Sequence, residues 1–197
     1  MESKELTIVI VTFKSDEKII NCLKSISYNI PVIVVENSDN KTFKNKIENI
    51  FTNVNCILAG ENKGYATANN IGLKSVKTKY ALVLNPDTIL DKDAIKFFFN
   101  TKEQIKDFWL IGPANNQIIN FNENDSNFKE VNNLKGFAIF LNLSKFNQDY
   151  FDENFFLFFE EIDLCRRVKK NKGKIYLNKN IFIKHDGASS VNKTNEL

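Results

Sequence analysis

Apolar runs alternate with helical patterns along the first 84 residues, and this alternation strongly limits the folds open to the chain. Short runs rich in β-branched residues, typical of buried strands, occupy residues 6–13, 31–35, 54–58 and 80–84. Apolar residues recur at helical spacing between them, in residues 16–28, 43–50 and 65–76. Four strands separated by three helices predict an α/β fold with a parallel, doubly wound sheet.

The pattern changes after residue 90, where strands are no longer separated by full helices. Helices are predicted at residues 91–105 and 160–170, and strands at 109–112, 117–121, 137–143, 174–177 and 181–183. The polar, asparagine-rich residues 122–133 predict a mobile loop. A chain of 197 residues, 43% of them hydrophobic, can bury one sizeable core. We therefore expect a single domain over residues 1–197, with an α/β front half at 1–90 and an α+β rear half at 91–197.

Polar residues follow three of the predicted front-half strands. Glu36 follows the second strand, Asn62 and Gly64 follow the third, and Asp87 follows the fourth after Asn85 and Pro86. Parallel strands end at one edge of a sheet, where ligands bind in open α/β folds. A carboxylate there can hold a divalent cation that bridges substrate phosphates. The alternative is a simple turn in which Asp87 caps the next helix.

Three acids, Glu160, Glu161 and Asp163, open the predicted rear helix directly after a run of phenylalanines. Apolar surroundings and neighbouring acids both raise a carboxyl pKa, which would suit one of the three to accept a proton. The alternative is helix capping together with pairing to Arg166 and Arg167 one turn later. His185 is the only histidine, and it would complete a metal shell if the fold brought it near Asp87.

Composition and the missing motifs exclude several classes of function. The net charge of +3 is spread along the chain and does not indicate a nucleic-acid binder, although the lysine cluster at residues 169–174 could meet phosphates or an anionic membrane. Three widely spaced cysteines argue against a disulfide framework or structural zinc and favour a cytoplasmic setting. The first apolar run is too short for a signal sequence. Neither a P-loop nor a dinucleotide fingerprint occurs.

Eight motifs in order resemble family 2 glycosyltransferases of the GT-A fold, in the rhamnosyltransferase-like group that builds bacterial surface polysaccharides. These motifs lie at residues 10–15, 34–38, 62–72, 84–87, 136–138, 151–156, 160–167 and 185–187. The resemblance implies a nucleotide-sugar-binding half at 1–90 and an acceptor-side catalytic half at 91–197. It also implies inverting transfer from a nucleotide-sugar donor, dTDP-rhamnose or a UDP-hexose, to a glycan or lipid-linked glycan acceptor.

The resemblance also implies roles for individual residues. Glu161 takes the position of the catalytic base, while Asp87 and His185 take those of ligands to Mn²⁺ or Mg²⁺. The residues expected to bind the donor are Thr12, Phe13, Glu36, Asn62, Lys63, Gly64, Asn69, Asn85 and Asp87. Both Glu36 and Glu161 stand where the family more often has aspartate.

Family members commonly continue well beyond the point where this sequence ends. The acceptor would then be held partly by a partner glycosyltransferase, by a second copy of the chain or at the inner face of the cell membrane. The alternative function is a catalytically weak GT-A domain that binds a sugar nucleotide or a partner enzyme.

Overall fold

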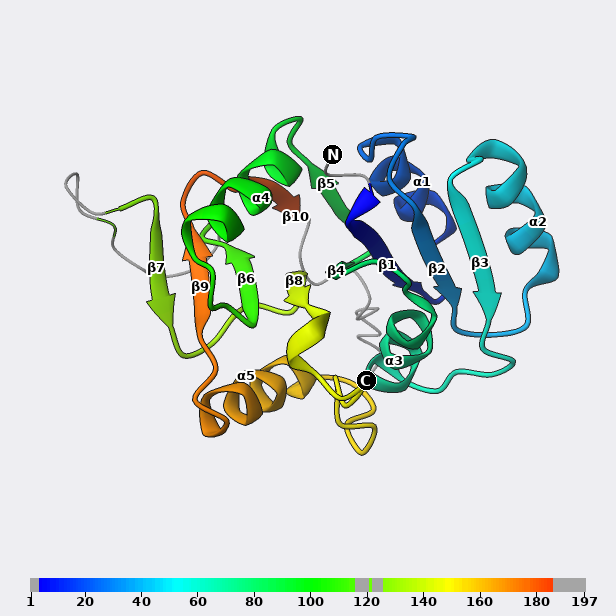
Figure 1. The fold of residues 1–197 in the computed structure, drawn as a ribbon. Helices are drawn as coiled ribbons and strands as arrows, with labels where there is room; N and C mark the ends of the chain where they lie inside the picture. Colours follow the sequence, from blue (N-terminus) through cyan, green and yellow to red (C-terminus); the bar gives the residue numbers. More distant parts are fainter. Residues whose placement is uncertain (1–3, 116–120, 122–125, 186–197) are drawn as a thin grey trace, which may run out of the picture.

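The computed structural model describes residues 4–115, 121 and 126–185. One eight-stranded sheet runs through both halves of the chain in the order β3-β2-β1-β4-β8-β6-β9-β7, and helices cover its two faces (Figure 1). The strands of this sheet are β1 (Leu6–Thr12), β2 (Val32–Glu36), β3 (Val54–Leu58), β4 (Tyr80–Leu84), β6 (Leu110–Pro113), β7 (Phe128–Val131), β8 (Ala138–Asn142) and β9 (Ile175–Asn178).

The front half confirms the predicted parallel sheet. Strands β1 to β4 pair in parallel, with β1 in the middle between β2 and β4. Their polar ends therefore meet at one edge, as the sequence predicts. In the rear half β8 runs antiparallel to both β4 and β6, whereas β6 and β9 are parallel.

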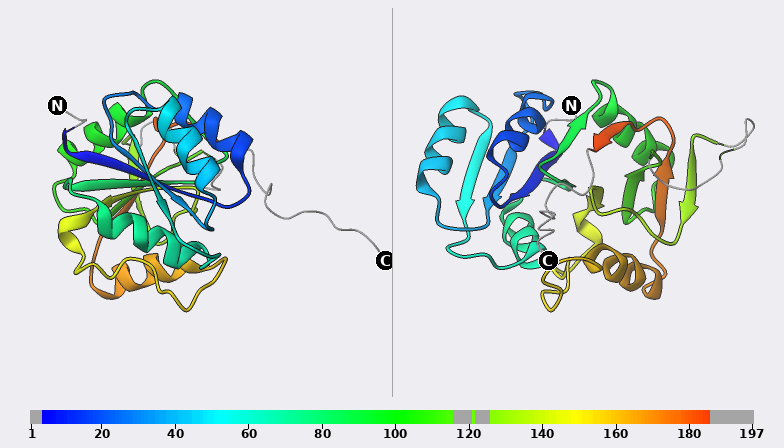
Figure 2. Two further views of the ribbon diagram at one scale, coloured as in Figure 1. Left: turned by 90° about the vertical axis from the view of Figure 1, so that its right-hand side faces the viewer. Right: turned by 180° about the vertical axis from the view of Figure 1, so that it is seen from behind.

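Two layers of helices sandwich the sheet because successive strand residues point to opposite faces. Ile8 and Ile10 of β1 belong to the core under one helical layer, whereas Val9 between them belongs to the core under the other. The first layer comprises α1 (Asp16–Lys24), α2 (Lys41–Ile50) and α4 (Ala94–Gln104), and the second comprises α3 (Tyr65–Ser75) and α5 (Glu160–Lys170). Figure 2 shows the same arrangement from two further directions.

A small second sheet brings the segment after Asp87 next to the segment that ends in His185. It pairs β5 (Thr88–Leu90) with β10 (Ile183–His185) in antiparallel register, so that His185 lies opposite Thr88. The sequence did not predict β5. Strand β10 begins and ends two residues later than the strand predicted at 181–183. The apolar pattern of a three-residue strand is too short to be recognised in the sequence. Such strands are defined only by their pairing in the folded structure.

The predicted loop at residues 122–133 is wrong in part, because Phe128–Val131 forms β7 at the edge of the large sheet. Its two central side chains, Lys129 and Glu130, are exposed, as is usual for an edge strand, and the sequence therefore reads as a loop. Residues 122–125 and most of the strand predicted at 117–121 lie outside the described residues. Phe121, the described residue of that range, belongs to no helix or strand.

Within the described part of the chain, no helix combines the length and the apolar character that crossing a membrane requires. The three cysteines are free and buried.

Candidate active site

Asp87 stands in a tight turn directly after the central strand β4. The amide of Asn85 donates to the carbonyl of Phe137 at 2.9 Å, and the Thr88 hydroxyl donates to the carbonyl of Asn85 at 2.7 Å. These bonds fix the turn and direct the chain into β5. The Asp87 side chain is 10% exposed at the carboxyl edge of the sheet.

The structure brings His185 to Asp87. Its Nε2 atom lies 3.3 Å from Asp87 Oδ1, and its ring stacks on Phe137 with a centroid separation of 4.8 Å and an interplanar angle of 8°. The stacking and the β5–β10 pairing together hold the imidazole in one orientation. The two predicted metal ligands are therefore neighbours, although no group of three or more His, Cys, Asp or Glu side chains suited to a metal ion occurs among the described residues.

Tyr65, at the start of α3, joins this turn to the acids of α5. Its hydroxyl oxygen lies 2.9 Å from Asn85 Oδ1 and 3.3 Å from the carbonyl oxygen of Gly136. Burial raises the pKa of Tyr65 well above its usual range, and the charges of Glu160, Glu161 and Asp87 raise it further. The phenol therefore stays protonated.

Glu161 packs against Gly136 at the first turn of α5. A Cβ atom added to Gly136 would lie 3.4 Å from both Cβ and Cγ of Glu161, so the glycine leaves room for the carboxylate arm. The next residue, Phe137, is the one that stacks on His185. A short path of contacts thus connects the proposed base with the proposed metal ligands.

The three acids of α5 have different environments. Asp163 forms an ion pair with Arg167, in which Arg167 Nε lies 2.7 Å from Asp163 Oδ2. For Asp163, the structural alternative given by the sequence, pairing with an arginine one turn later, is therefore confirmed. Glu160 is 6% exposed, and its Oε2 has no hydrogen-bond partner among the described residues. Burial, with a smaller contribution from Glu161, raises the pKa of Glu160. The acid with the raised pKa is therefore Glu160, the residue directly before Glu161, which is the expected base.

The run of phenylalanines before α5 does not provide the apolar surroundings expected for these acids. Phe156, Phe158 and Phe159 are each more than half exposed. Glu160 is buried because the helix start packs against the body of the protein, not because this run folds over it.

The unpartnered carboxylate leads to a prediction about stability. Because burial raises the pKa of Glu160 in the folded state, ionised Glu160 opposes folding above its unfolded pKa of about 4.3, and protonation relieves this at lower pH. We expect Glu160→Gln to raise the free energy of unfolding at pH 7.5, by about 1 kcal/mol, and by less at pH 4.5. Urea denaturation at the two pH values measures this difference. Asp163→Asn, which removes an ion pair, should instead destabilise the fold at pH 7.5, and a destabilised Glu160→Gln would contradict the prediction.

Several predicted donor-binding residues meet at the ends of β1 and β2. Thr12 pairs in register with Glu36, and its Oγ1 is buried without a partner among the described residues. The Glu36 carboxylate is buried and accepts hydrogen bonds from the Ser38 amide at 3.0 Å and the Asn40 amide at 3.2 Å. Glu36 thereby shapes the loop after β2, while Phe13 is exposed beside it.

The loop after β3 is tied to the loop after β2 by Asn37, which the sequence analysis did not single out. The Asn37 side-chain amide donates to Asn62 Oδ1 at 2.9 Å, and its oxygen accepts from the Lys63 amide at 3.0 Å. Gly64 follows with φ +81°, which suits glycine. Asn69, one turn into α3, is fully buried and donates to the Tyr65 carbonyl at 2.9 Å. Asn37 and Tyr65 lie within or beside the recognised motifs, which is the signal that could have identified them.

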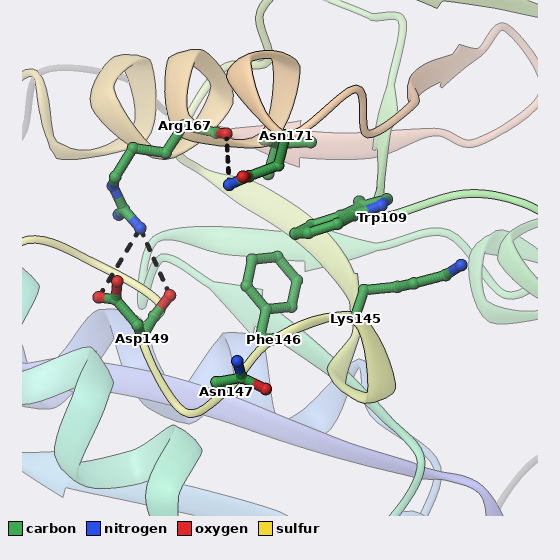
Figure 3. Close-up of a pocket in the computed structure, with 8 residues that line it drawn as sticks. Trp109, Lys145, Phe146, Asn147, Asp149, Arg167 and Asn171 are labelled. Carbon is green, nitrogen blue, oxygen red and sulfur yellow. Dashed lines mark hydrogen bonds and ion pairs between the residues drawn. The ribbon is translucent and has the colours of Figure 1, made fainter.

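Two surface hollows lie away from this site. The hollow in Figure 3, of about 230 Å³, is lined by Trp109 and Phe146 and by polar groups that include Asp149 and Arg167. A second, of about 340 Å³, lies between α3 and the segment before α5. Neither hollow is lined by Asp87, Glu161 or His185. Arg167 in the first is already engaged with Asp163 and with the carbonyl of Tyr150, so we place the chemistry at the sheet edge.

The eight-stranded sheet and the helices on its two faces define the class of fold as GT-A. Residues 1–349 of S. aureus TarS share the fold with a TM-score of 0.68 and 16% identity, over 89% of this chain and 58% of that one. The same fragment in complex with UDP-GlcNAc gives 0.71 over 95% and 61%. The family model "Glycosyl transferase family 2" matches residues 7–167, and the chain belongs to this family.

Two curated relatives agree with that assignment. The low-salt glycan biosynthesis hexosyltransferase Agl10 of Haloferax volcanii is 28% identical in an alignment of 193 residues that covers 84% of this chain and 62% of that protein. The teichoic acid poly(glycerol phosphate) polymerase of Staphylococcus epidermidis is 31% identical in an alignment of 102 residues that covers 48% of this chain and 14% of that protein. The chain thus spans about three fifths of the first relative and a small part of the second.

Proposed function

We propose that this chain is an inverting, metal-dependent glycosyltransferase. It would move a sugar from dTDP-rhamnose or a UDP-hexose to a glycan or lipid-linked glycan acceptor in surface polysaccharide synthesis. The observation that carries the proposal is the position of Tyr65, whose hydroxyl contacts Asn85 Oδ1, two residues before Asp87, and the carbonyl of Gly136, the glycine against which Glu161 packs. Acids from both halves of the chain therefore converge on one spot. A relative named as a hexosyltransferase and a similar fold in complex with UDP-GlcNAc support this reading.

Asp87 and His185 suit a divalent cation, Mn²⁺ or Mg²⁺. One carboxylate oxygen and one imidazole nitrogen 3.3 Å apart provide two ligands of the kinds that such ions accept, and imidazole favours Mn²⁺ over Mg²⁺. Donor phosphates and water would supply the remaining ligands. When bound, the cation supplies positive charge that offsets the charge of the departing nucleoside diphosphate.

Glu161 would act as the base of a single displacement. Its carboxylate takes the proton from an acceptor hydroxyl while that oxygen bonds to the anomeric carbon of the donor sugar. The bond from that carbon to the diphosphate breaks, and its electron pair leaves with the nucleoside diphosphate. Because attack and departure occur on opposite faces, the configuration inverts. Tyr65 and Asn85 hold the Asp87 turn in position through the 2.9 Å contact between them.

A screen of nucleotides and nucleotide sugars tests the proposal. The chain would be heated with UDP, dTDP, GDP and their common sugar conjugates, with and without MnCl₂. A ligand at 100 times its dissociation constant stabilises a folded protein by about 2.7 kcal/mol, which raises the melting temperature measurably. We expect one nucleotide class to stabilise the chain in a Mn²⁺-dependent way, and its sugar conjugate to be hydrolysed or transferred.

The same screen separates the alternative function. Metal-dependent binding without turnover of any donor would favour a catalytically weak domain that binds a sugar nucleotide or a partner. If no nucleotide stabilised the chain, the proposed donor site would be wrong. The cytoplasmic location expected from the cysteines fits a nucleotide-sugar donor and is part of the same proposal.

A further inference from the structure

A run of large apolar side chains projects into solvent just before α5. Phe156, Leu157, Phe158 and Phe159, here called the apolar loop, are between 49% and 65% exposed, and Ile162 one turn into the helix is 45% exposed. Scattered apolar residues are normal on a protein surface, but a contiguous group of this kind marks an interaction site.

The outward conformation of the apolar loop is held by the fold. Phe158 and Phe159 have φ of 70° and 71°, a left-handed conformation that is unfavourable for bulky residues. The loop is anchored at both ends, because the Phe156 carbonyl accepts from the Tyr65 amide at 2.7 Å and the Phe159 carbonyl accepts from the Asp163 amide at 2.9 Å. Strain of this kind persists where the surrounding structure imposes it, and it is common at functional positions.

The helix that follows the apolar loop has a basic outer stripe. Ile162, Arg166, Lys169 and Lys170 recur at helical spacing on the side of α5 that faces solvent, and Arg166 and Lys170 are exposed. The acids of α5 lie off this stripe, since Glu160 is buried, Glu161 packs on Gly136 and Asp163 pairs with Arg167.

The acids on the other side of the apolar loop are already engaged. Asp152 accepts from the Asn154 amide at 2.9 Å, while Glu153 accepts from Asn70 at 3.0 Å and pairs with Lys74 at 3.4 Å. Lys169 of the basic stripe is paired as well, with Glu130 of β7. Arg166 and Lys170 are therefore the exposed basic side chains of the stripe beside the apolar loop.

The apolar loop and the basic stripe lie on the same side of the molecule. Figure 1 shows α5 along the lower side, with the yellow segment before it projecting beyond the helix. Both views in Figure 2 show the same relation. A flat surface could therefore contact the loop and the outer stripe of α5 together.

We propose that this face docks onto an anionic lipid surface. The apolar loop inserts at the boundary between headgroups and acyl chains, and Arg166 and Lys170 contact the anionic headgroups. Apolar side chains combined with nearby basic residues are the features by which proteins without a membrane span bind such surfaces. Docking does not require the transfer reaction proposed above. If that reaction also occurs, Glu161 would face acceptors held at the membrane surface, because it lies two residues after the apolar loop.

Vesicle flotation tests the proposal without any measurement of enzyme activity. The purified chain is mixed with vesicles of phosphatidylcholine alone or of phosphatidylcholine with phosphatidylglycerol. We expect binding to the anionic vesicles, weaker binding to the neutral ones, and loss of the difference in about 1 M NaCl, where charges are screened within a few ångströms. The double variant Phe158→Ser/Phe159→Ser should bind anionic vesicles roughly tenfold or more weakly.

A charge variant and a matched control complete the experiment. Arg166→Glu/Lys170→Glu should lose the preference for anionic lipid, whereas Tyr28→Ser, which removes an exposed aromatic ring elsewhere, should bind like the parent. Thermal melting confirms that each variant is folded. Failure of the parent to bind anionic vesicles, or full binding by the Phe158→Ser/Phe159→Ser variant, would overturn the proposal. So would a parent that dimerises through the apolar loop and ignores vesicles, since a second copy would then cover this face.

Discussion

Replacing Glu161 by glutamine is expected to lower the rate of sugar transfer roughly 10²–10⁴-fold, the usual contribution of a general base. Glutamine keeps the shape of the side chain and its packing on Gly136, but its amide cannot take a proton from an acceptor hydroxyl. Binding of the donor nucleotide should be unchanged, because Glu161 is not among the residues expected to bind the donor. Steady-state kinetics and calorimetric titration with the nucleotide measure the two effects.

Asp163→Asn is the matched control for this prediction. It neutralises an acid on the same helix, but one whose carboxylate is committed to Arg167, so transfer should continue at nearly the parent rate in folded protein. A Glu161→Gln variant as active as the parent would show that Glu161 is not the base.

The same variants distinguish Glu161 from its neighbour. Glu160 is buried with a raised pKa, a property often found in catalytic acids and bases, yet burial also separates its carboxylate from a substrate in solution. We expect Glu160→Gln to reduce transfer less than Glu161→Gln does. The reverse order, together with loss of the fall in transfer rate at low pH in the Glu160 variant, would assign the base to Glu160.

Replacing Asp87 by alanine is expected to abolish the dependence of donor binding on Mn²⁺. Loss of a residue that only supports a metal ligand commonly costs 10–100-fold in metal affinity, and loss of a carboxylate ligand itself should cost at least about as much. His185 alone, stacked on Phe137, would retain weak metal binding at most. Calorimetric titration of the nucleotide with and without Mn²⁺ gives the metal-dependent part of the affinity directly.

Asp91→Ala provides the control for the charge change. Asp91 is exposed just after β5, and its side chain accepts a local hydrogen bond from the Asp93 amide at 3.1 Å. This variant should keep the full Mn²⁺ effect. If Asp87→Ala kept it as well, Asp87 would not be a metal ligand, and the proposed role of the turn after β4 would have to be abandoned.

Much of the fold was predictable because the relevant patterns are local. The β-branched run that forms β3 matches its strand at both ends, and α2 and α3 follow the spacing of their apolar residues closely. Strand β7 was missed because an edge strand with Lys129 and Glu130 facing solvent has the composition of a loop. Apolar residues are expected inside a protein, and only the tertiary structure reveals that the phenylalanine run before α5 projects outward.

The candidate site was predictable only as separate residues. Sequence motifs selected Asp87, Glu161 and His185, but their proximity depends on contacts between distant segments. Tyr65 lies within the motif at residues 62–72, but its contacts with Asn85 and Gly136 follow only from the tertiary structure.

The sequence by itself determined the order of strands and helices as far as β4, the parallel pairing of those strands and the acids available at the sheet edge. It could do so because hydrophobic periodicity and strand-ending residues act over a few positions of the chain. Only the tertiary structure decided that β10 pairs with β5, that His185 therefore reaches Asp87, and which acid of α5 is buried. The physical reason is that these outcomes depend on long-range strand pairing and packing, whose energy comes from partners far away in the sequence.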